Sequence, residues 1–295
     1  MQLPNYGKIW GIDELWIEKF PTINWNVQEK LDGSQFSFGL VNDVLVCQSK
    51  NTQLDLKHPN KMFSKAVAWC VENKERLDPC YIYRAEALNS TRHNHIKYDA
   101  VPDCGFVIFD IENKLDGRIP LLSGDVYYEC LRLSIPCVDT QSLQLADVEN
   151  SLLKLWSKLP TISMLGGKPE GFVFKSNTHK DDFGYPLRLK LVSSEFKERA
   201  NKPKQLKQNN SVVDKIVEVL ATEARWRKAV QHVAEQDGDM HGNQSIPALL
   251  KELSTDTMVE EQDYIQNILW REYWPKINKA LANQFVAWYK AQQEK

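Results

Sequence analysis

The stretch Glu29-Lys30-Leu31-Asp32-Gly33-Ser34 places a lysine at the end of one strand-like segment and a tight turn before the next. Residues 25–31 have the composition of a short strand, and in residues 35–41 large apolar side chains alternate with polar or small ones. Alternation with a period of two indicates a half-buried β-strand. Because Asp-Gly-Ser is typical turn chemistry, the sequence predicts two strands joined by a turn directly after the lysine.

Two later segments place further cations on strands. In Glu170-Gly171-Phe172-Val173-Phe174-Lys175, alternation puts the final lysine on the same face as Gly171. In Leu187-Arg188-Leu189-Lys190-Leu191-Val192, the arginine and the lysine are two residues apart and therefore face the same way. The sequence contains neither G-x-x-x-x-G-K-[ST] nor G-x-G-x-x-G. We therefore expect three strands to present side-chain cations that bind a polyphosphate.

The composition is that of a globular chain. Of 295 residues, 37 are basic, 39 are acidic and 42% are apolar, which gives a formal net charge of −2. No apolar run approaches the ~18 residues of a membrane helix, so we expect a cytoplasmic protein without a membrane partner. The six cysteines form no C-x-x-C pair, which predicts free thiols. Residues 197–207 carry five basic residues and one acid, typical of either a phosphate-binding patch or a solvated linker.

The order of the cationic segments resembles that of the covalent nucleotidyltransferases, the superfamily of ATP-dependent DNA ligases, RNA ligases and mRNA capping guanylyltransferases. The matching segments, in chain order, are Lys30-Leu31-Asp32-Gly33 (motif I), Tyr83-Arg84-Ala85-Glu86 (motif III), Phe106-Val107-Ile108-Phe109-Asp110-Ile111 (motif IIIa), residues 170–175 (motif IV) and Lys190 (motif V). Lys50 falls where the superfamily usually has an arginine. The resemblance spans about residues 25 to 200.

The segment after Lys190 favours one branch of this superfamily. Ser193-Ser194-Glu195-Phe196-Lys197-Glu198 resembles the segment that closes the catalytic domain of RNA ligase 2-like enzymes. In DNA ligases and capping enzymes motif V leads into an OB-fold, which is rich in short strands. Here the residues after 204 show helical periodicity instead, with a predicted capping box at Ser211 and Asp214 and a helix that Pro275 is expected to kink or split. The chain is thus identified as a member of the ATP-dependent RNA ligases of this family.

The fold class expected is therefore α+β. A nucleotidyltransferase (adenylation) domain of antiparallel sheets with flanking helices would occupy residues 1–203, and a small all-helical C-terminal domain residues 204–295. The linker is expected at Lys202-Pro203-Lys204, and helices are expected at residues 60–76, 124–133 and 147–155.

The resemblance implies a role for each matched residue. Lys30 would be the nucleophile that forms a lysyl-AMP with ATP, assisted in catalysis by Lys175 and Lys190. Deprotonating an ordinary lysine at pH 7 costs about 4.6 kcal/mol, and the cations near Lys30, with a divalent metal, are expected to lower its pKa. Glu170 would hold Mg²⁺ or Mn²⁺ through water. The nucleotide-binding residues expected are Glu29, Leu31, Asp32, Gly33, Gln35, Lys50, Glu86, Phe109, Glu170 and Arg188.

Several of these expectations are specific. Glu86 would bind the ribose, Phe109 would stack on adenine and Asp32 would brace its turn, where Gly33 would allow a backbone conformation that a side chain strains. Related enzymes have a second motif V lysine where this chain has Val192, so either Arg188 supplies that cation or one phosphate contact is missing.

The activity expected is the joining of a 3′-OH end of RNA to a 5′-phosphate end, through lysyl-AMP and an adenylylated 5′-phosphate, by a monomer. Three alternatives stay open: a ligase of DNA or of DNA–RNA hybrids, a binding protein for nucleic-acid ends that has lost turnover, and a capping guanylyltransferase. Whether nicked duplexes or single-stranded ends are joined also stays open. His93 and His95, two apart in a polar stretch, are interpreted as part of a loop.

Overall fold

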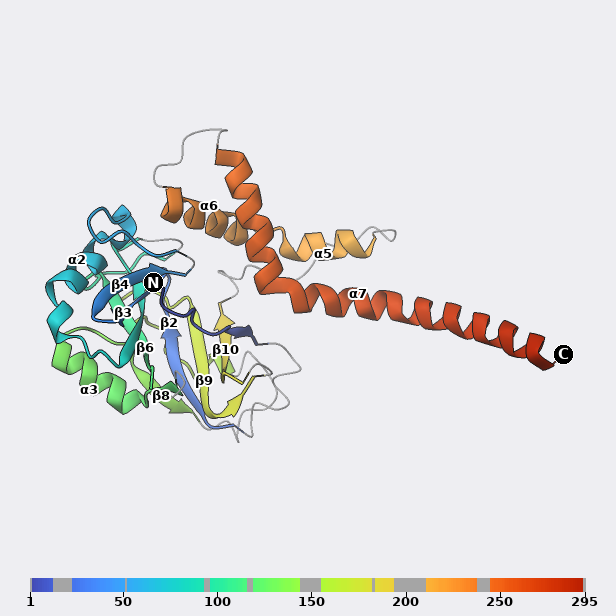
Figure 1. Cartoon of the computed structure of the whole chain (residues 1–295), viewed down its shortest axis with the longest axis horizontal. Helices are drawn as coiled ribbons and strands as arrows, with labels where there is room; N and C mark the ends of the chain where they lie inside the picture. Colours follow the sequence, from blue (N-terminus) through green and yellow to red (C-terminus); the bar gives the residue numbers. More distant parts are fainter. Residues whose placement is uncertain are drawn as a thin grey trace. The chain divides into compact units, whose positions relative to one another are not determined.

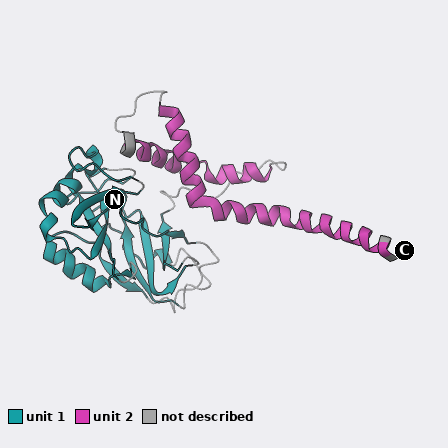
Figure 2. Cartoon of the chain, viewed as in Figure 1, with its two compact units in different colours: residues 1–196 teal, residues 197–295 magenta. Residues whose placement is uncertain are grey.

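The computed structural model describes residues 2–12, 23–50, 52–92, 96–115, 119–143, 155–181, 184–193, 211–237 and 245–293. The chain divides into two compact units, Met1–Phe196 (unit 1) and Lys197–Lys295 (unit 2), shown in Figure 2. The linker expected at residues 202–204, with the domain boundary placed there, lies outside the described residues. So do His93, His95 and residues 147–154 of one expected helix.

Unit 1 contains two five-stranded sheets (Figure 1). Sheet A has the order β1-β10-β9-β2-β8, formed by Trp10–Gly11, Pro186–Val192, Gly171–Lys180, Trp25–Lys30 and Thr140–Leu143. Sheet B has the order β4-β3-β5-β6-β7, formed by Val44–Ser49, Ser34–Val41, Tyr81–Ala87, Phe106–Asn113 and Ile119–Pro120. All neighbouring strands are antiparallel except β1 and β10. This confirms the predicted fold class and the predicted strands.

The hairpin between β3 and β4 shows how the local sequence fixes the register of sheet B. Val41 is paired with Val44, and the two residues between them, Asn42 and Asp43, have φ angles of 50° and 61°. Asn and Asp tolerate the left-handed region better than other non-glycine residues. A two-residue turn of this kind matches the twist of the flanking strands, so β3 and β4 pair without a bulge.

Apolar residues of the two sheets form separate cores. In sheet B, Phe36, Phe38 and Phe106 are fully buried and pack against α2 (Ser64–Glu72) and α3 (Ser123–Leu133). Short 3-10 turns, Lys61–Phe63 and Lys74–Arg76, flank α2, so the helix expected over residues 60–76 is only partly α-helical. The core of sheet A is built on one face only and includes Trp25 and Phe174. Its other face is therefore free to carry polar groups.

Unit 2 is helical in its described part. Helices α5 (Val212–Leu220), α6 (Glu223–Asp237) and α7 (Ile246–Gln293) follow one another, and α5 begins with the predicted capping box of Ser211 and Asp214. Pro275 does not split the last helix, because α7 continues through it; the kink expected there stays a prediction. Proline removes one intrahelical hydrogen bond, and the helix-forming residues on both sides preserve the rest.

Two further expectations concern the chemistry of the whole chain. All six cysteines are free thiols, as predicted, and Cys47, Cys70 and Cys130 are buried. Among the described residues, no helix is both long enough and apolar enough to span a bilayer.

Candidate active site

Four cations of unit 1 lie on one face of sheet A, as the strand alternation predicted. Lys30 is paired with Gly171 across β2 and β9, and Lys175 follows four residues later on β9. Arg188 of β10 is paired with Lys175, and Lys190 follows two residues later. Residues paired directly across antiparallel strands point to the same face. The side chains of all four cations therefore share the face opposite the core of sheet A.

The ammonium group of Lys30 is held by a carboxylate. Its Nζ lies 2.7 Å from both carboxylate oxygens of Glu170, the residue directly before β9. Burial alone would lower the pKa of Lys30, but the charges of Glu170 and Glu86 raise this pKa well above its ordinary value. The carboxylates therefore set the direction of the pKa shift of Lys30 here, and its lowering by the cations together with a divalent metal stays a prediction. Lys175 and Arg188 are directed to other carboxylates, those of β6.

The turn after Lys30 is fixed by hydrogen bonds. The backbone N–H of Asp32 donates to the hydroxyl of Tyr98 (2.7 Å), and its carboxylate accepts from the backbone N–H of Ile96 (2.8 Å). A Cβ atom built on Gly33 would lie 2.5 Å from the carbonyl oxygen of Ala87. Glycine is therefore required by this close approach to β5, whereas the sequence suggested that it is required by the turn conformation. The positive-φ glycines do not include Gly33.

Glu86 of β5 also lies at this turn. Its Oε1 accepts a hydrogen bond from the backbone N–H of Gly33 at 3.0 Å. Burial raises the pKa of Glu86 to about 8, against the lowering effect of Lys30. Glu86 and Glu170 thus place two carboxylates close enough to Lys30 to raise its pKa.

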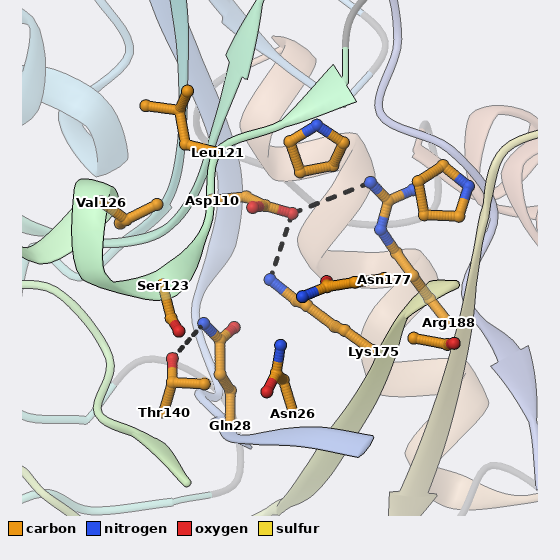
Figure 3. A pocket seen from close by; sticks show the side chains of 13 residues that line it. Asn26, Gln28, Asp110, Leu121, Ser123, Val126, Thr140, Lys175, Asn177 and Arg188 are labelled. Atoms are coloured by element: carbon orange, nitrogen blue, oxygen red, sulfur yellow. Dashed lines mark hydrogen bonds and ion pairs between the residues drawn. The ribbon is translucent and has the colours of Figure 1, made fainter. Parts of the chain in front are cut away.

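The other two buried cations are bonded to carboxylates of β6. Lys175 Nζ lies 3.1 Å from Asp110 Oδ2 and donates to the carbonyl oxygen of Phe109 at 2.7 Å. Arg188 lies 3.8 Å from the same Asp110 oxygen and 3.9 Å from Glu112. Figure 3 shows Lys175 and Arg188 pointing from sheet A toward Asp110. These contacts join sheet A to sheet B.

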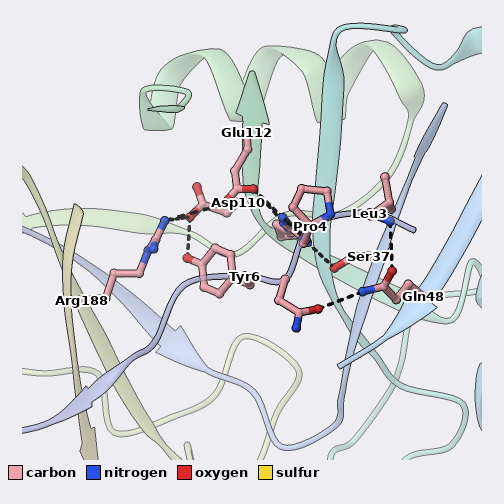
Figure 4. A network of polar contacts seen from close by, with 10 residues as sticks. Leu3, Pro4, Tyr6, Ser37, Gln48, Asp110, Glu112 and Arg188 are labelled. Atoms are coloured by element: carbon pink, nitrogen blue, oxygen red, sulfur yellow. Dashed lines mark hydrogen bonds and ion pairs between the residues drawn. The ribbon is translucent and has the colours of Figure 1, made fainter. Parts of the chain in front are cut away.

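The N-terminal segment crosses this cluster. The hydroxyl of Tyr6 donates to Asp110 Oδ2 at 2.6 Å, and the Arg188 guanidinium lies 4.2 Å from the centre of the Tyr6 ring. The carbonyl of Pro4 accepts from Arg84, which is fully buried and bonded to Glu112. Figure 4 shows this chain of contacts from Gln48 on β4 to Arg188 on β10. Residues 3–6 therefore fix the two sheets relative to each other at the cation cluster.

Val192 occupies the position where the resemblance places a second lysine. It is paired with Gly171, which is itself paired with Lys30, so the three residues form one row across sheet A. Arg188 lies four residues earlier on β10, about 13 Å along the strand. Its guanidinium is 2% exposed and directed to the β6 carboxylates. Arg188 therefore does not replace the missing cation beside Lys30 in this structure.

The remaining expected nucleotide-binding residues have different surroundings. Glu29 lies on the other face of β2, where it accepts from the backbone N–H of Met164 at 2.8 Å and burial raises its pKa. Leu31 is buried in a small apolar cluster. Gln35 is paired with Glu86 across β3 and β5, and Lys50 directly follows β4. The half-buried Phe109 ring contacts the ring of Tyr6 edge-on at 5.3 Å between centres.

Sequence reasoning gave no role to five residues of this region, although two of them, Arg84 and Asp110, lie in the matched segments. The five are Tyr6, Gln28, Arg84, Asp110 and Glu112. For Asp110 and Glu112 a signal existed, because each interrupts an otherwise apolar strand, and the structure buries both. No periodicity or motif marks Tyr6, whose contact with Asp110 spans 104 positions of the chain.

A strand-end lysine shares one face of sheet A with three further cations, in a domain of two sheets that has the nucleotidyltransferase fold. The chain belongs to the RNA ligase family, since the model of that family matches residues 23–192, more than half of the chain. No curated protein was found to match it.

Solved structures support the same fold. Two structures of Naegleria gruberi RNA ligase variants with ATP and Mn each have a TM-score of 0.50 to this chain, at 17% and 18% sequence identity. Each comparison covers 66% of this chain and 57% or 59% of the Naegleria chain. The matched region thus spans less than two thirds of those proteins, and at this identity the likeness concerns the fold alone.

Proposed function

We propose that this chain is an ATP-dependent RNA ligase of the RNA ligase 2-like branch and that Lys30 is its nucleophile. The observation that carries the proposal is the placement of Lys30 at a strand end, on the sheet face that also presents Lys190 and Lys175. Membership of the RNA ligase family and the ATP- and Mn-bound relatives support it.

The first step forms a covalent adduct. The Nζ of Lys30, as the free amine, attacks the α-phosphorus of ATP, so that a nitrogen–phosphorus bond forms and the bond to pyrophosphate breaks. Lys190 is the nearer of the other cations along β10, and it would stabilise the charge that develops on the phosphate. Lys175 and Arg188 would contribute once the nucleotide competes with Asp110 and Glu112 for them.

In the later steps the AMP group moves to RNA. The 5′-phosphate oxygen of one RNA end displaces Lys30 from the adenylate, and a 3′-hydroxyl of the other end then displaces AMP and forms the phosphodiester. Glu86, Gln35 and Lys50 are placed on sheet B or at the end of its β4 strand, and we assign them to the nucleotide as the resemblance implies.

The carboxylates around Lys30 suit a divalent cation. Glu170 and Glu86 offer oxygen ligands, the type that Mg²⁺ and Mn²⁺ prefer, and both act on the charge of Lys30. A bound cation would offset the charges of the phosphates and of these carboxylates. Glu170 would thereby no longer hold the Lys30 ammonium, and the free amine would become accessible at lower pH.

Adduct formation with labelled ATP tests the proposal. The wild-type chain should become labelled in the presence of Mg²⁺ or Mn²⁺, and Lys30→Ala should abolish labelling without loss of folding. Lys158→Ala removes an exposed lysine of the same unit and is the matched control. Labelling of Lys30→Ala at the wild-type yield would contradict the assignment. Labelling by GTP alone would indicate a guanylyltransferase, and no labelling at all a binding protein.

Sealing assays identify the substrate. Nicked duplexes that differ only in RNA or DNA at the strand carrying the 3′-hydroxyl should show faster sealing with RNA. Equal rates on DNA would indicate the DNA or hybrid ligase.

A further inference from the structure

A pocket lined largely by polar residues lies beside the cation cluster, with Gln28, Lys175 and Asp110 in its wall (Figure 3). It is lined by residues of β2, β8 and β9, by the start of α3 and by Asp110. Asn26 and Gln28 precede Lys30 by four and two residues on β2, and alternation places all three side chains on one face. Gln28 is therefore about 7 Å along the strand from Lys30. A base whose α-phosphate is at Lys30 can reach that far.

One buried atom in the described lining of this pocket lacks a hydrogen-bond partner. Gln28 is 7% exposed, and its Nε2 donates to the hydroxyl oxygen of Thr140 at 2.9 Å. Its Oε1 is buried and has no hydrogen-bond partner among the residues that the structure describes. Buried polar atoms in proteins are nearly always paired. This amide oxygen in the wall of the pocket is therefore available to a donor that a ligand supplies.

The chemistry of that atom separates the two purines. Adenine carries an amino donor at its 6-position, whereas guanine carries a carbonyl acceptor there. With Nε2 engaged by Thr140, Gln28 presents an acceptor to the pocket. An acceptor pairs with the amino group of adenine and is left unpaired, or repelled, against the carbonyl of guanine.

We propose that the amide oxygen of Gln28 accepts a hydrogen bond from the 6-amino group of adenine and thereby selects ATP over GTP. This inference rests on the proposed function, because it assumes that a nucleotide binds with its α-phosphate at Lys30. Thr140 acts through Gln28, since its hydroxyl holds the amide in the pocket wall through this hydrogen bond.

The test is the ratio of adduct formation rates with ATP and with GTP in the full-length chain. Gln28→Met keeps the length of the side chain but removes both polar atoms. We expect the ATP rate to fall about 3- to 10-fold and the ATP-to-GTP ratio to fall by about tenfold or more. Gln28→Glu keeps an acceptor and should keep the preference for ATP. Gln141→Met makes the same change at an exposed position of β8 and should leave the ratio unchanged.

Because both nucleotides are compared on one preparation, the ratio does not depend on how much of a variant is folded. A Gln28 side chain that merely braces β2 against β8 would lower both rates equally. An unchanged ratio in Gln28→Met therefore overturns the inference, as does a wild-type chain that uses GTP as well as ATP, or a Gln28→Glu chain that prefers GTP. A wild-type chain that forms no adduct with either nucleotide contradicts the proposed function instead.

Discussion

A lysine attacks phosphorus only as the free amine, and Lys30 is held as an ammonium by the carboxylate of Glu170. The same short contact that raises its pKa also fixes the direction of its side chain at the end of β2. The structure thus separates two requirements of a lysine nucleophile. Orientation is already present, and deprotonation has to come with the ligands that neutralise the carboxylates.

Glu86 provides a pH-dependent prediction at the residue scale. Burial raises its pKa to about 8 in the folded chain, from 4.5 ordinarily. Between these values the folded state binds the proton more tightly than the unfolded chain does, so stability is complete at low pH and decreases as the pH rises. The slope reaches about 1.4 kcal/mol per pH unit for this group. In urea denaturation at pH 5, 6.5 and 8, the free energy of unfolding should fall less with rising pH in Glu86→Gln than in the wild type. If the free energy of unfolding changes with pH by the same slope in both proteins, the raised pKa of the buried Glu86 carboxyl is contradicted.

Gly33 is a second residue whose substitution has a defined outcome. Its added Cβ would approach the Ala87 carbonyl to 2.5 Å and the Glu86 side chain to 2.8 Å, both on the neighbouring strand β5. We expect Gly33→Ala to lower the free energy of unfolding by about 1–3 kcal/mol and to slow adduct formation, because the turn after Lys30 must move. Gly11→Ala, where nothing lies within 4 Å of the added atom, is the matched control. If the two variants have similar free energies of unfolding in urea denaturation, the turn accommodates the added Cβ atom without destabilising the fold.

At the scale of elements, the packing of α6 on α7 depends on one buried cation. Arg225 is 2% exposed, and its guanidinium lies 2.5 Å from Glu261 and 3.7 Å from Asp256, both buried residues of α7. Removing the arginine takes an ion-pair partner from each of two buried carboxylates, although Asp256 keeps Lys228 at 3.2 Å. Such a loss typically costs about 3–5 kcal/mol.

Arg225→Ala should therefore destabilise unit 2 by roughly that amount in chemical denaturation followed by circular dichroism. Arg227, two residues later on the same helix, forms an ion pair with Glu223 in which both side chains are more than half exposed. Arg227→Ala should change the free energy of unfolding by less than about 1 kcal/mol. Equal free energies of unfolding for Arg225→Ala and Arg227→Ala would contradict the stabilising role of the buried ion pairs of Arg225.

The elements also show what local sequence can and cannot predict. The strands that carry Lys30, Lys175 and Arg188 were predictable because alternation and turn chemistry are local signals. β8 was not, and it pairs with β2 across more than a hundred positions of the chain. The partner of each cation is equally non-local: the strand pattern placed Lys175 on the correct face but could not show that Asp110 of β6 would hold it.

At the scale of the whole molecule, the site residues and the helical region belong to different units. Every expected nucleotide-binding residue lies in unit 1, which has its own apolar cores, whereas unit 2 contributes none of them. Unit 2 therefore has no assigned part in forming lysyl-AMP. A contribution to holding the RNA would matter only after Lys30 carries AMP.

We therefore predict that a fragment of residues 1–201 stays soluble, forms the AMP adduct with ATP and fails to seal nicked RNA duplexes. Adduct yield and sealing rate would be measured on the same preparation, with full-length protein as the control. A fragment that seals at the full-length rate would show that residues 202–295 take no part in substrate engagement. A fragment that is soluble but forms no adduct would show instead that unit 2 is needed for the nucleotide step.

Salt dependence distinguishes how the full-length chain holds its two substrates. ATP would bind to a small number of cations on one sheet face. An RNA duplex held along its backbone requires several phosphate contacts, and each contact releases counterions. The logarithm of the sealing rate at subsaturating RNA should therefore fall with the logarithm of salt concentration more steeply than the rate of adduct formation. Pre-adenylylated protein, mixed with nicked duplex at 50, 100 and 200 mM salt, isolates the RNA-dependent steps. If both rates fall with the same slope, RNA engagement involves no more phosphate contacts than the nucleotide does, and residues 197–207 act as a solvated linker.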